Sequence, residues 1–420
     1  MNYLNKEIVI VGLGYVGLPL AIKLSSHFSI IGYDISEKRI NELNKNYDNT
    51  NEIKKSTLSR SKNIKFTFDK SNIDKKYFYI VTVPTPVKKD NTPDLSLLNQ
   101  ACRLVGKAIN KGAIIVFEST VYPGVTEKVC APIIEKESGL KLNSEFYLGY
   151  SPERINPGDQ EHSIDKIVKV VSGSDNKITK IIGEVYKKII KAGVFYASSI
   201  EVAETAKAIE NAQRDINIAF INEISLLCQK LNISVYDVLD AAKTKWNFLP
   251  FQPGLVGGHC IGVDPYYLAH IAKEIGVSTD IILAGRKLND NMTSVVSKLI
   301  QKQILPTDRI LQIGISFKEN VPDIRNSKAA SLAKIFLDKK YKIDIYDPIV
   351  DSEEVISSYN IKMSGMEKKY DCIIIAVAHK FISEKIVDIV NHTKKSTKVF
   401  DISGKYKNLF LSKNLKYWSL

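Results

Sequence analysis

The sequence predicts an α/β protein with an N-terminal Rossmann-type doubly wound sheet, a central all-helical domain and a C-terminal second Rossmann-like α/β domain. Three observations lead to this prediction: strand–helix alternation at the start of the chain, a helical pattern of about thirty residues without Pro or Gly from Glu201, and renewed alternation after Pro306. A chain of 420 residues is long for a single core. We therefore expect three domains, over residues 1-198, 199-304 and 305-420.

The N-terminal domain begins with short apolar segments that are typical of buried parallel strands. Amphipathic stretches such as Leu18–Ser26 and Leu95–Asn110 separate them, so strands and helices alternate. The segment from Ile167 to Phe195 continues the pattern. The expected strands are Glu7–Val11, Ser29–Tyr33, Phe78–Val83, Ala113–Phe117 and Glu145–Leu148.

A glycine turn joins the first strand to the first helix. Gly12, Gly14 and Gly17 form the pattern G-x-G-x-x-G, and Tyr15 and Val16 lie within it. Such glycines let the chain turn tightly, let the backbone approach a pyrophosphate and let the helix pack on the strand. The N-terminus of the helix then faces the anion. The pattern predicts a dinucleotide site.

An acidic residue ends the next strand. Asp34 follows Gly17 by seventeen residues, at the position where a carboxylate binds ribose hydroxyls, which favours NAD as the cofactor. Arg39 keeps NADP open, because a nearby arginine can accept a 2′-phosphate.

Two loops follow predicted strands of this sheet at the edge where ligands bind in open α/β proteins. The first carries Pro84 and Thr85, and the second carries Ser119 and Thr120. Their hydroxyls are candidates for contacts with the cofactor or the reacting carbon. For Thr85 and Ser119, ordinary turn chemistry explains the residue types equally well.

The central domain is predicted to be helical throughout. Lys207 and Asn211 lie four residues apart on its long helix, hence on one face, where an amine and an amide could bind an oxyanion. By spacing alone, a solvated helix face is the simpler interpretation. The expected helices are Glu201–Asn232, Val235–Lys243 and Ile281–Gln303.

Cys260 stands in the run Gly-Gly-His-Cys-Ile-Gly-Val-Asp-Pro, the only one of five cysteines in a glycine-rich loop. Flanking glycines and a nearby carboxylate suit a nucleophile that attacks a carbonyl better than they suit core packing. Asp264 in this run and Glu153, in another Pro-bearing loop, are candidate bases, although each residue type is more often structural.

The C-terminal domain repeats the strand–helix order of residues 7 to 34 in outline, but its first loop lacks the three glycines. That loop, Phe317–Arg325, offers Lys318 and Arg325 in place of a glycine-wrapped pyrophosphate. We therefore expect a second nucleotide-binding lobe for a different ligand. The expected elements are Arg309–Ser316, Ala329–Lys339, Lys342–Asp347 and Asp371–Val377.

Composition excludes several classes of protein. The net charge of +13 comes from scattered lysines rather than a basic stripe, so no nucleic-acid partner is expected. A phosphate-bearing substrate is a better explanation for the excess of positive charge. No apolar run is long enough to span a membrane, and no membrane partner is expected. Five unpaired cysteines argue against a disulfide framework and against a metal site, and favour the cytoplasm.

Several motifs, and the order in which they follow one another along the chain, resemble the UDP-glucose/GDP-mannose dehydrogenase family. The resemblance covers nearly the whole chain, and the nine-residue run around Cys260 is its most specific part. Within the family, Ser151–Asp159 and Phe251–Cys260 are similar to the branch that acts on UDP-N-acetylhexosamines. The motifs are Gly12–Gly17, Thr120, Ser151–Arg154, Lys207–Asn211, Gly257–Pro265 and Phe317–Arg325.

The resemblance implies an N-terminal NAD domain, a UDP-binding C-terminal domain and a homodimer formed through the central helices. It also raises Thr120, Glu153, Lys207, Asn211 and Asp264 to catalytic positions beside Cys260. Substrate contacts are implied at Arg154, Lys207, Asn211, Phe251, Gly257, Arg286, Asn289, Phe317, Lys318 and Arg325.

The expected activity is the NAD-dependent oxidation of C6 of a UDP-N-acetylhexosamine to the carboxylate, through a thiohemiacetal and a thioester of Cys260. UDP-N-acetylglucosamine is the first choice of substrate, for the synthesis of surface polysaccharide precursors such as capsule. UDP-N-acetylgalactosamine, UDP-N-acetylmannosamine and UDP-glucose remain alternatives. A two-electron β-hydroxyacid dehydrogenase, which would need neither Cys260 nor a third domain, and a non-catalytic NAD-sensing or nucleic-acid-binding protein are more distant ones.

Overall fold

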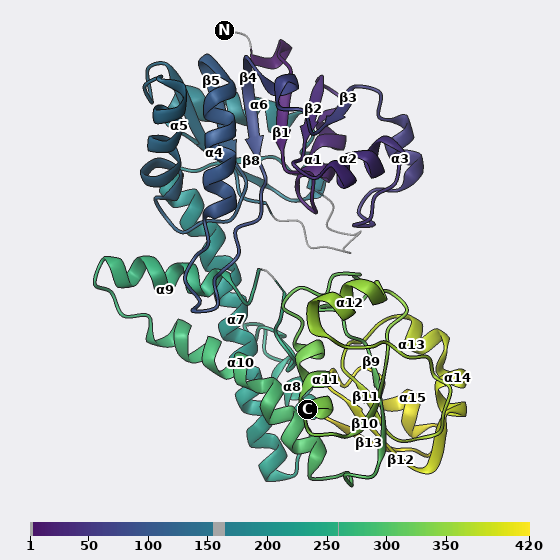
Figure 1. Ribbon diagram of the computed structural model, residues 1–420. Helices are drawn as coiled ribbons and strands as arrows, with labels where there is room; N and C mark the ends of the chain where they lie inside the picture. Colours follow the sequence, from purple (N-terminus) through teal and green to yellow (C-terminus); the bar gives the residue numbers. More distant parts are fainter. Residues whose placement is uncertain (1–2, 154–163, 259) are drawn as a thin grey trace. The chain divides into compact units, whose positions relative to one another are not determined.

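A computed structural model describes residues 3–153, 164–258 and 260–420 (Figure 1). The chain divides into two compact units, Met1–Glu210 with Tyr266–Ser278 and Asn211–Pro265 with Thr279–Leu420. The chain therefore passes from one unit to the other inside α7 (Ile200–Leu231) and inside α9 (Asp264–Glu274), and again just before α10 (Asp280–Gln301). The predicted division into three domains stays a prediction.

The first unit contains an eight-stranded sheet in the order β3-β2-β1-β4-β5-β6-β7-β8. Its strands run parallel except where β6 meets β7, which pairs antiparallel. The expectation of a parallel sheet was wrong at that one pair, because a short apolar run has the same pattern in either direction. The strands are β1 (Ile8–Val11), β2 (Ile30–Tyr33), β3 (Ile64–Thr67), β4 (Lys76–Val81), β5 (Ile109–Phe117), β6 (Phe146–Tyr150), β7 (Lys169–Gly173) and β8 (Val194–Tyr196).

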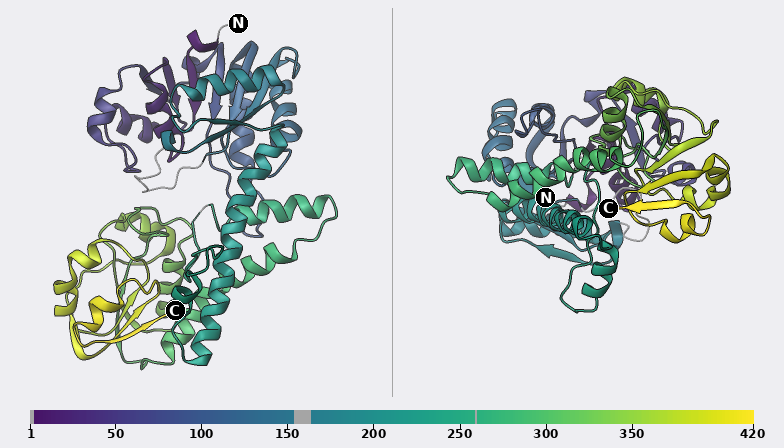
Figure 2. Two further views of the ribbon diagram at one scale, coloured as in Figure 1. Left: turned by 180° about the vertical axis from the view of Figure 1, so that it is seen from behind. Right: turned by 90° about the horizontal axis from the view of Figure 1, so that it is seen from below.

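Both faces of this sheet are buried. In β1, Ile8 and Ile10 join the core on one face, whereas Val9 and Val11 join the core on the other. Helix α4 lies over the face that is in front in Figure 1, and α6 lies over the opposite face (Figure 2). The helices are α1 (Gly17–Leu24), α2 (Glu37–Asn44), α3 (Lys55–Arg60), α4 (Ser96–Ala108), α5 (Ala131–Ser138) and α6 (Asn176–Lys187).

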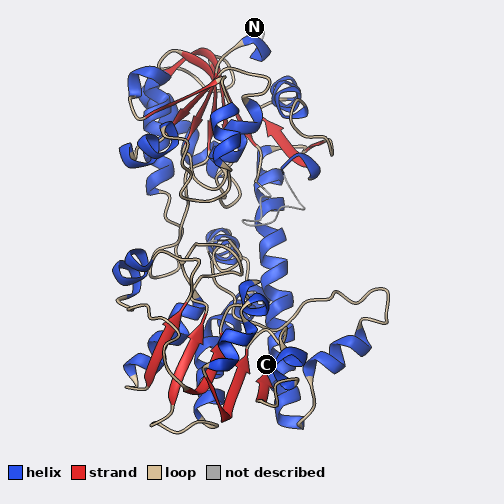
Figure 3. Cartoon of the chain, turned by 90° about the vertical axis from the view of Figure 1, so that its right-hand side faces the viewer, coloured by secondary structure: helices blue, strands red, loops and turns tan. Residues whose placement is uncertain are grey.

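The central segment is helical, as predicted. Helix α7 is one continuous helix of 32 residues, seen as the longest helix in Figure 3. It is followed by α8 (Val235–Ala242), α9 and α10. The helix α9 was not predicted, because its first turn lies inside the cysteine loop. Within the described part of the chain, no helix combines the length and the apolar character needed to cross a membrane.

The second unit contains a five-stranded parallel sheet in the order β10-β9-β11-β12-β13. Its first strand, helix and second strand match the predicted repeat, and α10 packs along α11. The strands are β9 (Arg309–Ile313), β10 (Lys342–Tyr346), β11 (Tyr370–Ile375), β12 (Thr393–Asp401) and β13 (Lys416–Ser419). The helices are α11 (Lys328–Asp338), α12 (Ser352–Tyr359), α13 (Phe381–Glu384), α14 (Ile386–Asn391) and α15 (Lys407–Leu411).

Candidate active site

The glycine turn after β1 has the geometry that a dinucleotide needs. Gly12 has φ of +97°, and a Cβ on Gly17 would lie 1.8 Å from the carbonyl oxygen of Gly12. A Cβ on Gly14 would meet no atom within 4 Å. The outer two glycines are therefore required by the turn itself, whereas Gly14 leaves its space open for a pyrophosphate. The turn fits NAD.

Asp34 lies just beyond β2, beside this turn. Its carboxylate accepts hydrogen bonds from the amides of Leu13, at 2.8 Å, and Ser36, at 2.9 Å. Arg39 donates from Nε to the carbonyl of Leu13 at 2.9 Å and forms an ion pair with buried Asp48 at 2.8 Å. Arg39 is itself buried, so the structure shows it supporting the turn. A direct contact between Arg39 and the cofactor stays a prediction.

The loops after β4 and β5 are bonded to each other. The Thr85 hydroxyl donates to the carbonyl of Thr120 at 2.5 Å, and the Ser119 hydroxyl donates to that of Val83 at 2.7 Å. The Tyr267 hydroxyl donates to the carbonyl of Thr85. These bonds favour the turn-chemistry interpretation of Thr85 and Ser119. In the same pair of loops, Thr120 is half-buried and Pro84 is exposed.

Glu153 belongs to a buried cluster of charges. The ammonium of Lys169 lies 2.8 Å from Glu118 and 3.4 Å from Glu153, and Tyr186 donates to Glu118. Burial raises the pKa of Glu118 to about 7, against the attraction of Lys169. Glu118 and Glu153 raise the pKa of Lys169 although burial opposes its charge. Glu118 and Lys169 were not singled out from the sequence, and Arg154 lies outside the described residues.

The candidate oxyanion residues on α7 are not on a solvated face. Lys207 is 7% exposed and Asn211 is 4% exposed, so the simpler interpretation from spacing was wrong. The amide of Asn211 donates to the carboxylate of Asp264 at 2.5 Å, which brings together two of the predicted catalytic residues. Asp264 is itself buried as the first residue of α9.

One turn before Lys207, Glu204 ties α7 to the segment after Thr120. Its carboxylate accepts from the amides of Gly124, at 2.5 Å, and Thr126, at 2.9 Å. Burial raises the pKa of Glu204 to about 7, although these contacts act in the opposite direction. Glu204 is a residue that sequence reasoning missed, because nothing in its helical spacing distinguishes it from a surface glutamate.

Cys260 is half-buried, whereas the other four cysteines are buried, and all five are free thiols. Its carbonyl accepts from the amides of Val263, at 3.0 Å, and Asp264, at 2.9 Å. The cysteine turn therefore leads directly into the helix that begins with Asp264. Gly258 has φ of +80°, a conformation that favours glycine, and Gly257 precedes it in the same turn.

Arg286 and Asn289, predicted as substrate contacts, lie fully buried in α10. Arg286 pairs with Asp215 at 2.5 Å, and Asn289 donates to Asp215 at 2.8 Å. Asn222 donates to Asn289 at 2.9 Å and exchanges two hydrogen bonds with the backbone of Gly254. This network supports the loop that contains Phe251, and contact of either predicted residue with substrate stays a prediction.

A cavity of about 220 Å³ lies in the second unit, beyond the carboxyl ends of β9, β11 and β12. Lys318 and Phe317, predicted as substrate contacts, line it together with Lys328 and Lys405, which were not predicted. Lys328 pairs with Asp290 at 2.7 Å and Lys405 pairs with Glu319 at 2.6 Å, and the positive charge that the three lysines bring to the cavity suits a phosphate-bearing ligand. Arg325 does not line the cavity and forms a fork with Asp323, so its role stays a prediction. The remaining lining residues are Pro253–Leu255, Ser316, Glu319, Ala329, Ala376–Ala378, Ile402 and Ser403.

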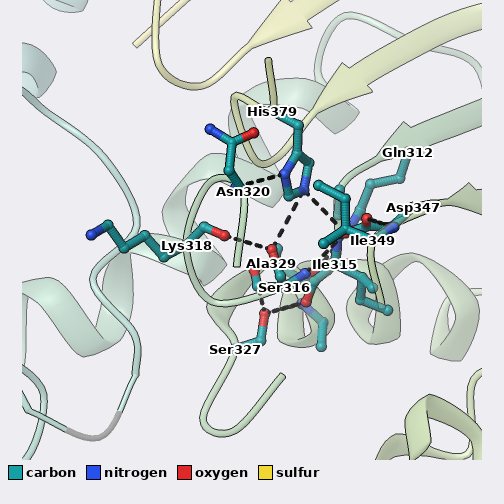
Figure 4. A network of polar contacts seen from close by, with 12 residues as sticks. Gln312, Ile315, Ser316, Lys318, Asn320, Ser327, Ala329, Asp347, Ile349 and His379 are labelled. Atoms are coloured by element: carbon teal, nitrogen blue, oxygen red, sulfur yellow. Dashed lines mark hydrogen bonds and ion pairs between the residues drawn. The ribbon is translucent and has the colours of Figure 1, made fainter. Parts of the chain in front are cut away.

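Asp347 occupies the position in the second unit that Asp34 occupies in the first. It accepts from the amide of Ile315 at 2.8 Å and contacts Nε2 of buried His379 at 3.1 Å, while Nδ1 of His379 accepts from the amide of Asn320 (Figure 4). Burial opposes charge on Asp347, but His379 and the amides of Ile315 and Ile349 hold its pKa below the usual range. Asp34 accepts the same kind of amide bonds beside the glycine turn, so the contact with His379 is what distinguishes Asp347 from it.

A protein with this fold and these sites handles a nucleotide in each α/β lobe and presents a thiol in a glycine turn, which defines a nucleotide-dependent oxidoreductase. The chain belongs to the UDP-glucose/GDP-mannose dehydrogenase family. The NAD-binding domain of that family matches residues 6–190, its central domain residues 201–291 and its UDP-binding domain residues 311–408. The protein is therefore an NAD-dependent UDP-sugar dehydrogenase.

Similar proteins extend over most of the chain. A UDP-N-acetyl-D-glucosamine 6-dehydrogenase of Pseudomonas aeruginosa is 48% identical, over 89% of this chain and 90% of that protein. The protein CapL of Staphylococcus aureus is 44% identical, over 99% of this chain and 100% of its own length. The solved structure of a UDP-D-ManNAc dehydrogenase from Pyrococcus horikoshii is similar with a TM-score of 0.83 at 30% identity, covering 94% of each chain.

Proposed function

We propose that this enzyme oxidises C6 of UDP-N-acetylglucosamine from the alcohol to the carboxylate. The observation that carries the proposal is the half-buried Cys260, placed in a turn that leads directly to the Asp264–Asn211 pair. A thiol nucleophile can carry an aldehyde on to an acid through a thioester, whereas a simple alcohol dehydrogenase has no step that uses one. The similarity at 48% to the Pseudomonas aeruginosa enzyme supports the choice of sugar.

The first oxidation removes a hydride from C6 and a proton from its hydroxyl. The turn of Gly12, Gly14 and Gly17 would hold NAD+, which would supply the hydride acceptor for this oxidation and for the next. The proton passes to a water held by Thr120, Lys207, Asn211 and Asp264. The Lys207 ammonium and the Asn211 amide then donate to the oxyanions that form at C6, which lowers the energy of each tetrahedral species.

The second oxidation runs through the cysteine. The Cys260 thiolate adds to the aldehyde carbon, so a sulfur–carbon bond forms and the carbonyl oxygen becomes an oxyanion. Loss of the remaining C6 hydride restores the carbonyl as a thioester. Water then adds to the thioester, the sulfur–carbon bond breaks, and Glu153 assists the proton transfers that release the acid.

Substrate binding is assigned to the second lobe. Lys318 and the other lysines of the cavity hold the diphosphate, and Phe317 lines the cavity beside them. The predicted contacts at Arg154, Phe251, Gly257, Arg286, Asn289 and Arg325 are part of the same proposal. We further propose a cytoplasmic enzyme that supplies a surface polysaccharide precursor, and five free cysteines suit such a reducing compartment.

We also propose that the enzyme is a homodimer joined through the central helices. Exposed apolar side chains follow one another along α7 at intervals of seven, eleven, seven and four residues. These intervals are close to whole numbers of helical turns, so the side chains form one stripe. A second copy of the same helix covers such a stripe symmetrically. The stripe consists of Val202, Ile209, Phe220, Leu227 and Leu231.

The test of the activity is stoichiometric. We expect two NADH for each UDP-sugar acid, with UDP-N-acetylglucosamine used faster than its galacto and manno epimers and UDP-glucose in one panel. The variant Cys260→Ser should stop before acid appears or stall at the acylated enzyme. One NADH per sugar with free aldehyde, or full turnover by Cys260→Ser, would refute the covalent route.

A further inference from the structure

The cysteine turn is bonded to a residue far away in the sequence. The amide of Gly258 donates to the carbonyl of Asn326 at 3.2 Å, and Nδ2 of Asn326 donates to the carbonyl of Gly258 at 2.9 Å. Asn326 lies in the loop between β9 and α11. This reciprocal pair uses both backbone polar groups of the residue two positions before Cys260, and therefore fixes the path of the turn.

The two segments are packed too closely for other side chains. A Cβ on Gly257 would lie 2.5 Å from the carbonyl oxygen of Asn326, and one on Gly258 would lie 2.7 Å from the Phe317 ring. A Cβ on Gly262 would lie 3.3 Å from Nδ2 of Asn326. The glycines around Cys260 are thus required by contact with this loop, and not by the turn alone.

The same loop forms a wall of the lysine-lined cavity. Phe317, Lys318 and Lys328 line it on either side of Asn326 in the sequence. The loop is held at its start by the Asp347–His379 network (Figure 4) and at its end by Ser327, whose hydroxyl donates to the carbonyl of Ile315 at 2.7 Å. One braced loop therefore contacts both the proposed nucleotide site and the turn that carries the thiol.

We propose that Asn326 is a positioning residue for the second oxidation: it holds the Cys260 turn against the nucleotide-binding loop, so that the thiolate meets the C6 aldehyde of a sugar whose UDP occupies the cavity. The proposal rests on the proposed function and deepens it. Asn326 touches neither the reacting carbon nor the nucleotide in this account. Loss of the Asn326 side chain should slow the second oxidation and leave the first unchanged, because only the second uses the Cys260 thiol.

The variant Asn326→Gly tests this directly. Asn326 has φ of +50°, which glycine adopts without strain, so the variant keeps the backbone and its acceptor carbonyl and loses only the amide donor. We expect UDP affinity measured by calorimetry to be unchanged. Acid formation should fall roughly 100-fold, the scale of a 1 Å misplacement of a reacting group, while aldehyde trapped with hydroxylamine accumulates.

The matched control is Asn414→Gly. Asn414 has φ of +58° and is exposed between α15 and β13, so its variant should behave as wild type. A second readout needs no turnover: the rate at which iodoacetamide alkylates Cys260 should change in Asn326→Gly and not in Asn414→Gly.

Two results would overturn the proposal. The first is a wild-type rate of acid formation and of alkylation in Asn326→Gly. The second is a parallel loss of UDP binding and of both oxidations, which would make Asn326 an ordinary structural contact. A failure of the proposed function is distinguishable, because it appears in the wild-type enzyme as one NADH per sugar.

Discussion

At the scale of single residues, the buried charges of this enzyme act in groups. Lys169 lies between Glu118 and Glu153, and the cluster is enclosed by the first unit with Lys169 only 4% exposed. The three groups come from a strand and from two loops that follow other strands of the sheet. Because Glu153 is the proposed base for thioester hydrolysis, the cation that holds it in place is as important as the carboxylate.

The first prediction concerns this lysine. In Lys169→Met, two buried carboxylates lose their cation, and breaking a buried pair from one side costs about 3–5 kcal/mol. We expect a large fall in the midpoint of thermal unfolding, and a smaller fall in Lys169→Arg. The exposed pair Lys107–Glu137 offers the control: Lys107→Met should change stability by less than about 1 kcal/mol. Equal effects of the two methionine variants would contradict the assignment.

The second prediction concerns pH and Glu204. Its pKa is about 7 in the folded protein against an ordinary 4.5, so the folded state binds this proton more tightly than the unfolded state does. The resulting stability is present in full below pH 4.5 and is lost as the pH rises through 7. The stability of wild type relative to Glu204→Gln should therefore fall, by up to about 3 kcal/mol, between pH 5 and pH 8.

Thermal unfolding of both proteins across that range provides the measurement. The comparison of wild type with Glu201→Gln serves as a control, because Glu201 is exposed on the same helix and forms only a surface pair with Lys128. A difference between wild type and Glu204→Gln that is independent of pH would show that Glu204 does not take up a proton in this range.

At the scale of elements, hydrophobic periodicity predicted eight of the 13 strands and six of the 15 α-helices of the described residues to within a few residues. The prediction of α7 over Glu201–Asn232 matches the observed Ile200–Leu231, because a helix of that length repeats its pattern many times. Helix α9 was missed, because three turns that begin inside a glycine-rich loop leave too short a pattern. Strand direction, as at β7, leaves no trace in an apolar run.

The candidate site likewise has features that the sequence predicted and features that it did not. The glycine turn, whose members are close in sequence, was found from spacing, whereas spacing alone favoured a solvated face for Lys207 and Asn211 and the family resemblance raised them to candidates. Contacts between residues far apart in the sequence were not predicted. Lys169 contacts Glu118, 51 positions away in the sequence, and Asn326 contacts Gly258, 68 positions away. Spacing also does not say which partner a hydroxyl or guanidinium takes, so the bonds of Thr85 and Arg39 needed the structure.

The third prediction separates two glycines of the same turn. Gly17→Ala places a Cβ 1.8 Å from a backbone oxygen, so we expect lower stability, by about 1–3 kcal/mol or more, together with lost NAD binding. Gly14→Ala meets nothing within 4 Å in the protein, so its unfolding midpoint should be unchanged. Its Kd for NAD should rise tenfold or more, about 1.4 kcal/mol, because the methyl group occupies the space of the pyrophosphate. Wild-type NAD affinity in Gly14→Ala would place the cofactor elsewhere.

At the scale of the whole molecule, two features bear on how the enzyme meets its partners. The net charge of +13 favours the approach of an anionic UDP-sugar, since a positive surface concentrates anions around it. The apolar stripe of α7 favours a second copy of the chain. Neither feature determines the fold. In the sequence, the charge was visible only as composition, and the stripe only as an uninterrupted helix.

The fourth prediction tests the dimer. A charge at the centre of a covered apolar stripe is not tolerated, so Phe220→Glu and Leu227→Glu should each convert the dimer into a monomer by light scattering. The control is Val387→Glu, in α14, where an equally exposed apolar residue lies outside the stripe. A wild-type protein that is monomeric at micromolar concentration would end the proposal.

The division of the chain into two units has a practical consequence for anyone who cuts it. The backbone crosses between the units at residues 210–211, 265–266 and 278–279. Cleavage at any one of these places gives two fragments that both contribute to at least one unit, so only the non-covalent packing within that unit holds a nicked enzyme together. For the same reason, neither lobe can be expressed alone by choosing a single start or stop codon, and a chimera that exchanges one lobe for a relative's needs three splice points.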